Sequence, residues 1–148
     1  MEAKLNFSKQ QKKSLKAISD SLPAYKNFEG AESFLLCYIA FETLTRKVWN
    51  FHRSAKANKE VNETHAPLPL PAVKSAFVAY NIKVSDNVLK PILDSTLNKR
   101  GAMNIRSLRN GLVHQWKIRD RDEILTRYDE IMGYLDKVIK AIKIEITQ

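Results

Sequence analysis

The sequence predicts an all-α fold, and three of its features lead to this prediction. Glycine is rare, with four among 148 residues, whereas hydrophobic residues make up 44% of the chain. Apolar residues recur every three or four positions over several long stretches, which is the spacing of one face of a helix. No stretch alternates apolar and polar residues in the way a half-buried strand does. The length suits one domain, so we expect residues 1–148 to form a single helical unit.

The first expected helix covers residues 8–22, with Ser8 as its N-cap and a lysine-rich polar side. Pro23 ends this helix, and a short connection leads to a second helix over residues 31–56. One side of the second helix is broad and apolar, which predicts a central place in a bundle. This side consists of Phe34, Cys37, Tyr38, Phe41, Leu44, Thr45, Val48 and Trp49.

Residues 58–71 are expected to form an extended loop laid over the bundle, because three prolines at alternate positions exclude a regular helix. Two shorter helices should follow, over residues 71–80 and 86–97. Ser85 is the expected cap of the second of these, and Pro91 should kink it or delay its start.

Two further helices complete the prediction. One spans residues 105–116, and the last spans 121–146, where Asp120 and Glu123 have the spacing of a capping box. Two apolar rows run along the last helix, and they are expected either to line the core or to form a dimer contact. The rows are Ile124, Tyr128, Ile131, Leu135, Val138 and Ile142, with Leu125, Met132, Ile139 and Ile146 beside them.

The charge of the chain favours polyanionic partners, nucleic acid in particular. Its 25 basic and 16 acidic residues give a net charge of +9. The positive charge is densest over residues 98–121, where Asp120 is the one acidic residue. The basic residues there are Lys99, Arg100, Arg106, Arg109, Lys117, Arg119 and Arg121.

Cysteine content and hydropathy predict a cytoplasmic protein. A single cysteine, Cys37, allows no internal disulfide and no cysteine metal cluster, which suits a reducing compartment. The longest apolar run, residues 34–41, is far shorter than a membrane span. No spacing typical of a metal or cofactor site occurs, so we expect neither, and no membrane contact.

The helix expected over residues 105–116 carries the side chains best suited to chemistry. Its apolar stripe consists of Ile105, Leu108, Leu112 and Trp116, and its polar side includes Arg106, Asn110 and His114. Arg109 projects near the edge of the stripe, where a permanent charge is costly unless a carboxylate, a phosphate or a subunit boundary receives it.

The segment Arg109-Asn110-Gly-Leu-Val-His114 resembles the Arg-Asn-x-x-x-His signature of the HEPN superfamily, a set of small all-helical domains. The resemblance implies a four-helix up-and-down bundle with one or two additional short helices. It also implies a homodimer in which two copies of the motif share one cleft. Many members are metal-independent endoribonucleases of prokaryotic defence or toxin–antitoxin systems, leaving 2′,3′-cyclic phosphate and 5′-hydroxyl ends, whereas others only bind.

With this resemblance, each motif residue has an expected role. Arg109 would hold the phosphate, His114 would transfer a proton and Asn110 would position them. Glu42, on the second helix, would orient Arg109 or His114, or simply pair with Arg46 one turn on. The residues expected to bind RNA around the site are Arg106, Lys99, Arg100 and Lys117.

Two other functions fit the same residues. One is a non-catalytic RNA- or nucleotide-binding module of the HEPN type. The other is a helical interaction protein whose partner is a companion antitoxin or nucleotidyltransferase. A lone histidine near a helix end is commonly a surface residue, and an arginine beside an apolar stripe commonly extends to water. RNA cleavage and RNA binding, both measured in the presence of a chelator, distinguish the three.

Overall fold

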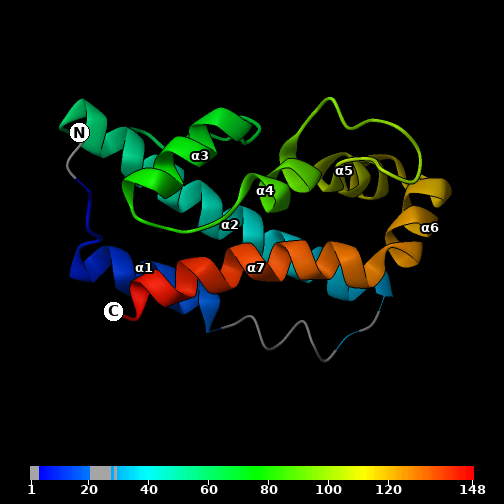
Figure 1. Ribbon diagram of the computed structural model, residues 1–148, viewed down its shortest axis with the longest axis horizontal. Helices are drawn as coiled ribbons and strands as arrows, with labels where there is room; N and C mark the ends of the chain where they lie inside the picture. Colours follow the sequence, from blue (N-terminus) through cyan, green and yellow to red (C-terminus); the bar gives the residue numbers. More distant parts are fainter. Residues whose placement is uncertain (1–3, 21–27, 29) are drawn as a thin grey trace.

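The structure is a computed structural model that describes residues 4–20, 28 and 30–148. Seven helices make up the regular structure of this described part, and no strand occurs in it. The prediction of an all-α fold is therefore confirmed. In order, the helices are α1 (Lys9–Ser19), α2 (Gly30–Ala57), α3 (Leu70–Ala79), α4 (Asp86–Leu93), α5 (Ile105–Gln115), α6 (Ile118–Thr126) and α7 (Tyr128–Ile146) (Figure 1).

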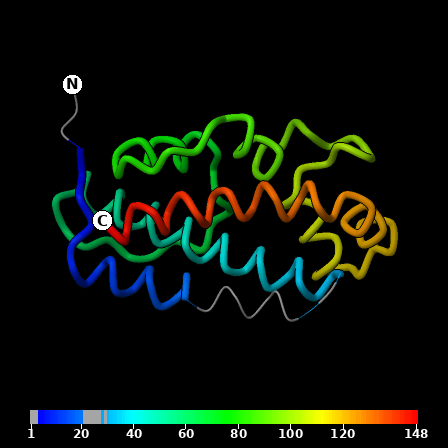
Figure 2. Tube along the Cα trace, turned by 60° about the horizontal axis from the view of Figure 1, so that its bottom comes forward, coloured from blue at the N-terminus to red at the C-terminus, as the bar shows by residue number. Residues whose placement is uncertain are grey.

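The helices run along one long axis. The chain passes out through α1 and back through α2, and the segment after α2 returns along it. Helix α3 then runs back toward the N-terminal end, and the chain goes out again through α4 to α5 and back through α7 (Figures 1 and 2). Consequently α2 and α7 point the same way, and they pack against each other along their length. The short helix α6 turns the chain at the end of the molecule opposite the C-terminus, next to α5.

The core lies between α2 and α7. The apolar side predicted for α2 is buried, apart from Trp49, which is half-buried with Arg53 5.8 Å above its ring. Most residues of the two apolar rows predicted for the last helix are buried and belong to the core of the chain, whereas Tyr128, Leu125 and Met132 are half-buried. The fully buried members of these rows are Ile124, Ile131, Leu135, Val138 and Ile142.

A capping box starts α1, as the prediction of Ser8 as N-cap implies. The backbone N–H of Gln11 donates to the Ser8 hydroxyl oxygen at 3.1 Å, and the backbone N–H of Ser8 donates to Oε1 of Gln11 at 2.9 Å. Both donors would otherwise lack an intrahelical partner. The predicted end of this helix at Pro23 lies outside the described residues.

Ser8→Ala should lower the free energy of unfolding by about 1 kcal/mol, because it removes this cap. Ser85→Ala is the matched control, since Ser85 occupies the N-cap of α4 but its side chain makes no capping hydrogen bond. We expect a change of no more than a few tenths of a kcal/mol there. Urea unfolding of both variants measures the difference, and equal losses would contradict the role of the Ser8 side chain.

The predicted end of α4 is wrong. The helix stops at Leu93 rather than at residue 97, and Asp94 takes an extended conformation. The Asp94 carboxylate instead accepts hydrogen bonds from the backbone N–H and the hydroxyl of Thr96, at 2.9 and 2.7 Å. Such a local turn competes with continuation of the helix. The helix begins at Asp86 after Ser85, as predicted, and Pro91 lies inside it, so the delayed start expected of Pro91 does not occur.

The predicted capping box of the last helix is also wrong. The chain enters α6 at Ile118, so Asp120 and Glu123 lie within that helix and are buried. Glu123 accepts hydrogen bonds from the backbone N–H groups of Gly101 and Met103, at 2.9 and 3.2 Å. It also pairs with Arg127 at 2.7 Å, where the helix breaks and α7 begins. Glu123 therefore ties the loop before α5 to α6.

Residues 58–69 form the predicted irregular segment, and Arg46 holds it against α2. The Arg46 Nη1 donates to the carbonyl oxygens of Thr64 and Ala66, at 3.0 and 2.7 Å. Among the described residues it makes no ion pair with Glu42, so the simple pairing expected within α2 is not formed.

Candidate functional site

The motif lies on α5, which forms over the predicted stretch and ends one residue early. Asn104 caps its first turn, since the Ser107 N–H donates to Oδ1 of Asn104 at 2.8 Å. The Asn104 amide in turn donates to the Leu97 carbonyl oxygen at 3.0 Å. At the other end, the backbone N–H groups of Trp116 and Lys117 donate to carbonyl oxygens of the last turn. Both ends of the motif helix are therefore fixed.

Gly111, inside the motif, allows α6 to approach α5 closely. A β-carbon at this position would stand 1.7 Å from Oδ2 of Asp120, so the carboxylate occupies the space that any side chain would need. Asp120 is 2% exposed and forms an ion pair with Arg100, which also lies 3.8 Å from Glu123. Arg100, an expected RNA ligand, thus has its charge neutralised within the chain.

Arg109 is half-buried between α5 and α2, with its charge unpaired. Its guanidinium carbon stands 5.5 Å from the centre of the Tyr38 ring, within the range of a cation–π interaction. Its Nη1 donates to Oδ1 of Asn110 at 2.9 Å, and its Nε is buried without a hydrogen-bond partner among the described residues. No carboxylate of the described part forms an ion pair with it. An anion would satisfy this side chain.

Charged side chains surround the Tyr38 hydroxyl. Burial raises the pKa of Tyr38 and the carboxylate of Glu42 raises it further, whereas the cations of α2 and α5 oppose this. These cations are Arg109, Arg106 and Arg46. Glu42 and Arg109 thus both act on Tyr38, but no hydrogen bond or ion pair joins them among the described residues, so the orienting contact expected of Glu42 is not formed. The sequence showed Tyr38 only as a core residue.

Tyr38→Phe should leave the free energy of unfolding unchanged or raise it by up to about 1 kcal/mol, because the buried hydroxyl has no hydrogen-bond partner among the described residues. Above pH 10 the free energy of unfolding of the variant should exceed that of the wild type by an increasing amount. In the wild type the unfolded chain ionises Tyr38 near its ordinary pKa of 10.0 while the folded chain resists ionisation, so stability falls as pH rises. Unfolding of both proteins from pH 8 to 11 measures this, and parallel pH profiles would contradict it.

His114 is exposed in the last turn of α5, on a different side from Arg109. Five residues on a helix turn the direction of the side chain by about 140°. One chain consequently does not bring Arg109 and His114 together. Asn110 accepts a hydrogen bond from Arg109, and no hydrogen bond joins Asn110 to His114 in the described part. Within the described residues the amide N–H groups of Asn110 donate to no partner, so they can donate to a phosphate oxygen.

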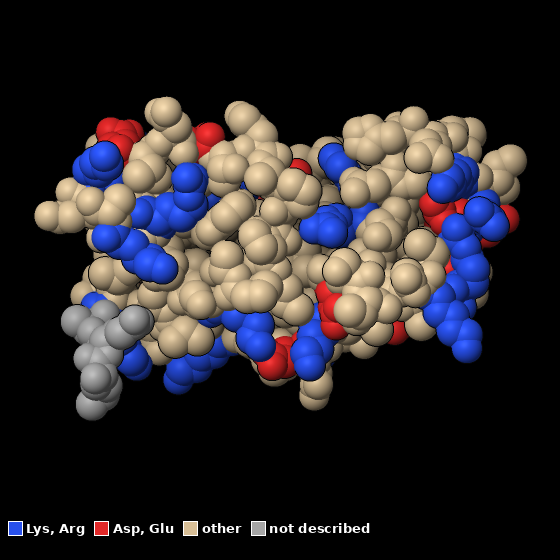
Figure 3. Space-filling view, turned by 90° about the horizontal axis from the view of Figure 1, so that it is seen from above, with Lys and Arg blue, Asp and Glu red and all other residues tan. Residues whose placement is uncertain are grey.

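The other predicted RNA ligands surround this helix. Lys99 is exposed, Lys117 is half-buried just before α6, and Arg106 directs its Nη1 to the Leu68 carbonyl oxygen at 3.4 Å. Figure 3 shows basic side chains gathered at the end of the molecule where α6 lies, with a few acidic ones among them. Buried Asp120 pairs with Arg100, and no ion pair joins it to another basic side chain of the described part.

Trp116 does not continue the apolar stripe, so that prediction is wrong. Its side chain is 67% exposed, and its backbone, at φ 49° and ψ 45°, is left-handed and ends the helix. This conformation costs a residue with a β-carbon about 1–2 kcal/mol. Val113 and Ile118 nearby in the chain are exposed as well, at 47% and 66%. The end of the motif helix therefore presents an apolar surface to solvent.

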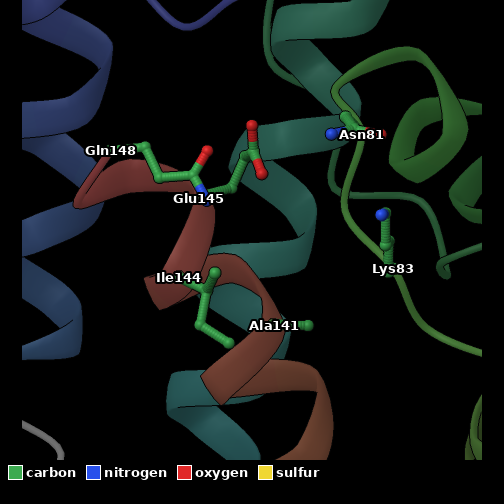
Figure 4. Close-up of a pocket in the computed structure, with 6 residues that line it drawn as sticks. All are labelled: Asn81, Lys83, Ala141, Ile144, Glu145 and Gln148. Carbon is green, nitrogen blue, oxygen red and sulfur yellow. The ribbon is translucent and has the colours of Figure 1, made fainter.

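Other features lie away from the motif. A shallow pocket of about 200 Å³ opens at the C-terminal end of α7, lined by Asn81, Lys83, Ala141, Ile144, Glu145 and Gln148 (Figure 4). It contains none of the predicted site residues. Within the described residues, no three His, Cys, Asp or Glu side chains are placed to hold a metal ion, and no helix has the length and hydropathy to cross a membrane. No family model, curated protein or solved structure matches the chain.

Proposed function

We propose that the chain is a HEPN-type, metal-independent endoribonuclease whose cleft is completed by a second copy. The observation that carries this proposal is the state of Arg109: a half-buried cation that no described carboxylate pairs with, in the same helix as an exposed histidine. Arginine presents a fixed set of donors to phosphate oxygens, and Asn110 beside it adds an amide donor.

The chemistry needs a proton acceptor and a proton donor. The 2′-hydroxyl of RNA attacks the adjacent phosphorus after losing its proton, and the 5′-oxygen leaves after gaining one. The products carry a 2′,3′-cyclic phosphate and a 5′-hydroxyl. Each chain supplies one exposed His114, so two copies in one cleft would supply both groups. Arg109 would stabilise the extra negative charge on the phosphorus oxygens in the transition state.

A second copy is needed because Arg109 faces α2 and His114 faces solvent. Exposed apolar side chains on the two helices support such a contact: Leu36 and Ile39 of α2 are 40% and 51% exposed, and Val113 of α5 is 47% exposed. A two-fold axis through such a contact would bring the Arg109 and His114 of both copies to one cleft.

The biological setting that the resemblance implies is a prokaryotic defence or toxin–antitoxin system, with a companion antitoxin or nucleotidyltransferase as a further partner.

One observation favours the alternative, a non-catalytic RNA- or nucleotide-binding module. No described residue orients His114 by a hydrogen bond, and Glu42 and Asn110 do not contact it in this way. In an enzyme that uses a histidine for proton transfer, a neighbouring group commonly fixes the ring. The alternative predicts RNA binding that weakens steeply with salt and no cleavage.

The deciding experiment incubates labelled single-stranded RNA in EDTA with wild type, Arg109→Ala and His114→Ala. We expect the wild type to cleave, and each variant to be slower by roughly a hundredfold or more. His65→Ala is the matched control, because His65 is exposed in the irregular segment and should keep full activity. Undiminished cleavage by His114→Ala would contradict the proposal. Binding without cleavage by the wild type would support the alternative.

A further inference from the structure

Trp116 occupies a strained backbone position at the end of α5, and no contact within the described part of the chain explains why a tryptophan stands there. Glycine is the residue usually found in a left-handed conformation after a helix, since a β-carbon is strained there. Trp116 adopts this conformation and leaves two thirds of its side chain in solvent, at 67%. Its indole makes no ring–ring or cation–π contact among the described residues, whereas the ring of Trp49 is covered by Arg53. A large, exposed and strained aromatic residue is a candidate binding group.

The charges near Trp116 point to a polyanion as its ligand. Lys117, Arg119 and Arg121 follow it directly along the chain, and His114 precedes it by two residues. Of the acidic residues nearby, Asp120 is buried against Arg100, and Glu123 is buried with Arg127 as its partner. Exposed Asp122 is the remaining carboxylate of this corner, 3.9 Å from Arg121. The corner between α5 and α6 thus combines an aromatic plane with net positive charge.

We propose that Trp116 is a stacking platform for an unpaired nucleobase. The basic residues of the corner hold the flanking phosphates, and stacking places a neighbouring phosphodiester beside His114. Aromatic side chains within a basic surface bind single strands in this way, since every base has a flat face. The proposal rests on the proposed function and restricts its substrate to single-stranded RNA. A second protein copy packed directly on the indole is a less favourable occupant than a base, because it would bring Lys117, Arg119 and Arg121 of the two copies against each other.

The test measures the fluorescence of Trp116 alone, in a Trp49→Phe protein, since the chain has two tryptophans. The ligand is a single-stranded deoxyoligonucleotide, which lacks the 2′-hydroxyl and is not cleaved. An abasic oligonucleotide of the same length, which keeps the phosphates but not the bases, serves as the control ligand. We expect saturable quenching by the first and little by the second. Because the deoxyoligonucleotide is not cleaved, this binding measurement remains valid even if the protein has no ribonuclease activity.

Trp116→Gly tests the side chain by affinity. We expect this variant to fold, because glycine suits the backbone conformation, and to bind the base-containing oligonucleotide roughly ten- to a hundredfold more weakly. Its affinity for the abasic oligonucleotide should not change. Val78→Ala, which alters a side chain 73% exposed on α3, is the control and should bind both ligands as the wild type does.

Two outcomes would overturn the stacking proposal. The first is equal affinity of Trp116→Gly and wild type for the base-containing oligonucleotide. The second is fluorescence of Trp116 that changes with protein concentration and not with oligonucleotide, which would assign the indole to a contact between two copies. Quenching by the deoxyoligonucleotide with no RNA cleavage by the wild type would keep the stacking site and reject the enzyme.

Discussion

Gly111→Ala is expected to lower the free energy of unfolding by about 2–4 kcal/mol, although alanine favours helices over glycine by about 1 kcal/mol. The added β-carbon would stand 1.7 Å from the Asp120 carboxylate. Asp120 must then move, which breaks its buried ion pair with Arg100 and separates α6 from α5. The same displacement would shift Asn110 and Arg109, so RNA cleavage should fall as well.

Gly133→Ala is the matched control for this prediction. Gly133 lies inside α7, and a β-carbon there would meet no atom within 4 Å. We expect this variant to be more stable by up to about 1 kcal/mol. Urea unfolding measures both changes, and two changes of the same sign would contradict the close approach at Gly111.

Asp120→Ala provides a second check, because it removes the carboxylate with which the β-carbon of Gly111→Ala would clash. Arg100 is 40% exposed and can turn to water when its partner is lost. The double variant should therefore be little less stable than Asp120→Ala alone, so the two effects would not add. If the losses in free energy of unfolding add instead, the Asp120 carboxylate is not the group that prevents a side chain at residue 111.

Regular periodicity made much of the fold predictable from the sequence. The apolar side of α2 is continuous over many turns, and its burial was predicted residue by residue except at Trp49. The boundaries of α2 and α5 fall within one or two residues of the expected ones. These features depend on spacing within a single helix, which the sequence contains directly.

The errors come from contacts between segments distant in the sequence. Asp120 and Glu123 have the spacing of a capping box, but their carboxylates bind a loop about twenty residues earlier. Trp116 has the period of the apolar stripe, yet the helix ends just before it. The cation–π contact of Arg109 with Tyr38 joins two helices, and no local pattern indicates it. The motif was visible in the sequence, whereas its surroundings were not.

The central claim is that two chains share one phosphodiester-cleaving cleft, and adding an inactive chain tests it. In excess, the double variant Arg109→Ala/His114→Ala would take most wild-type chains into mixed dimers. With a roughly tenfold excess, exchange of subunits and saturating RNA, activity per wild-type chain should fall to about a tenth. As a control, the same variant carrying Ile39→Asp as well should inhibit much less, because a charge on the exposed apolar face disfavours the contact.

The most direct test of the shared cleft is therefore to measure RNA cleavage in EDTA, per wild-type chain, as the inactive double variant is added. If two chains share one cleft, activity per wild-type chain should fall in proportion to the fraction of wild-type chains whose partner is also wild type. Activity that stays constant at every ratio would contradict it, since each chain would then carry a complete site of its own.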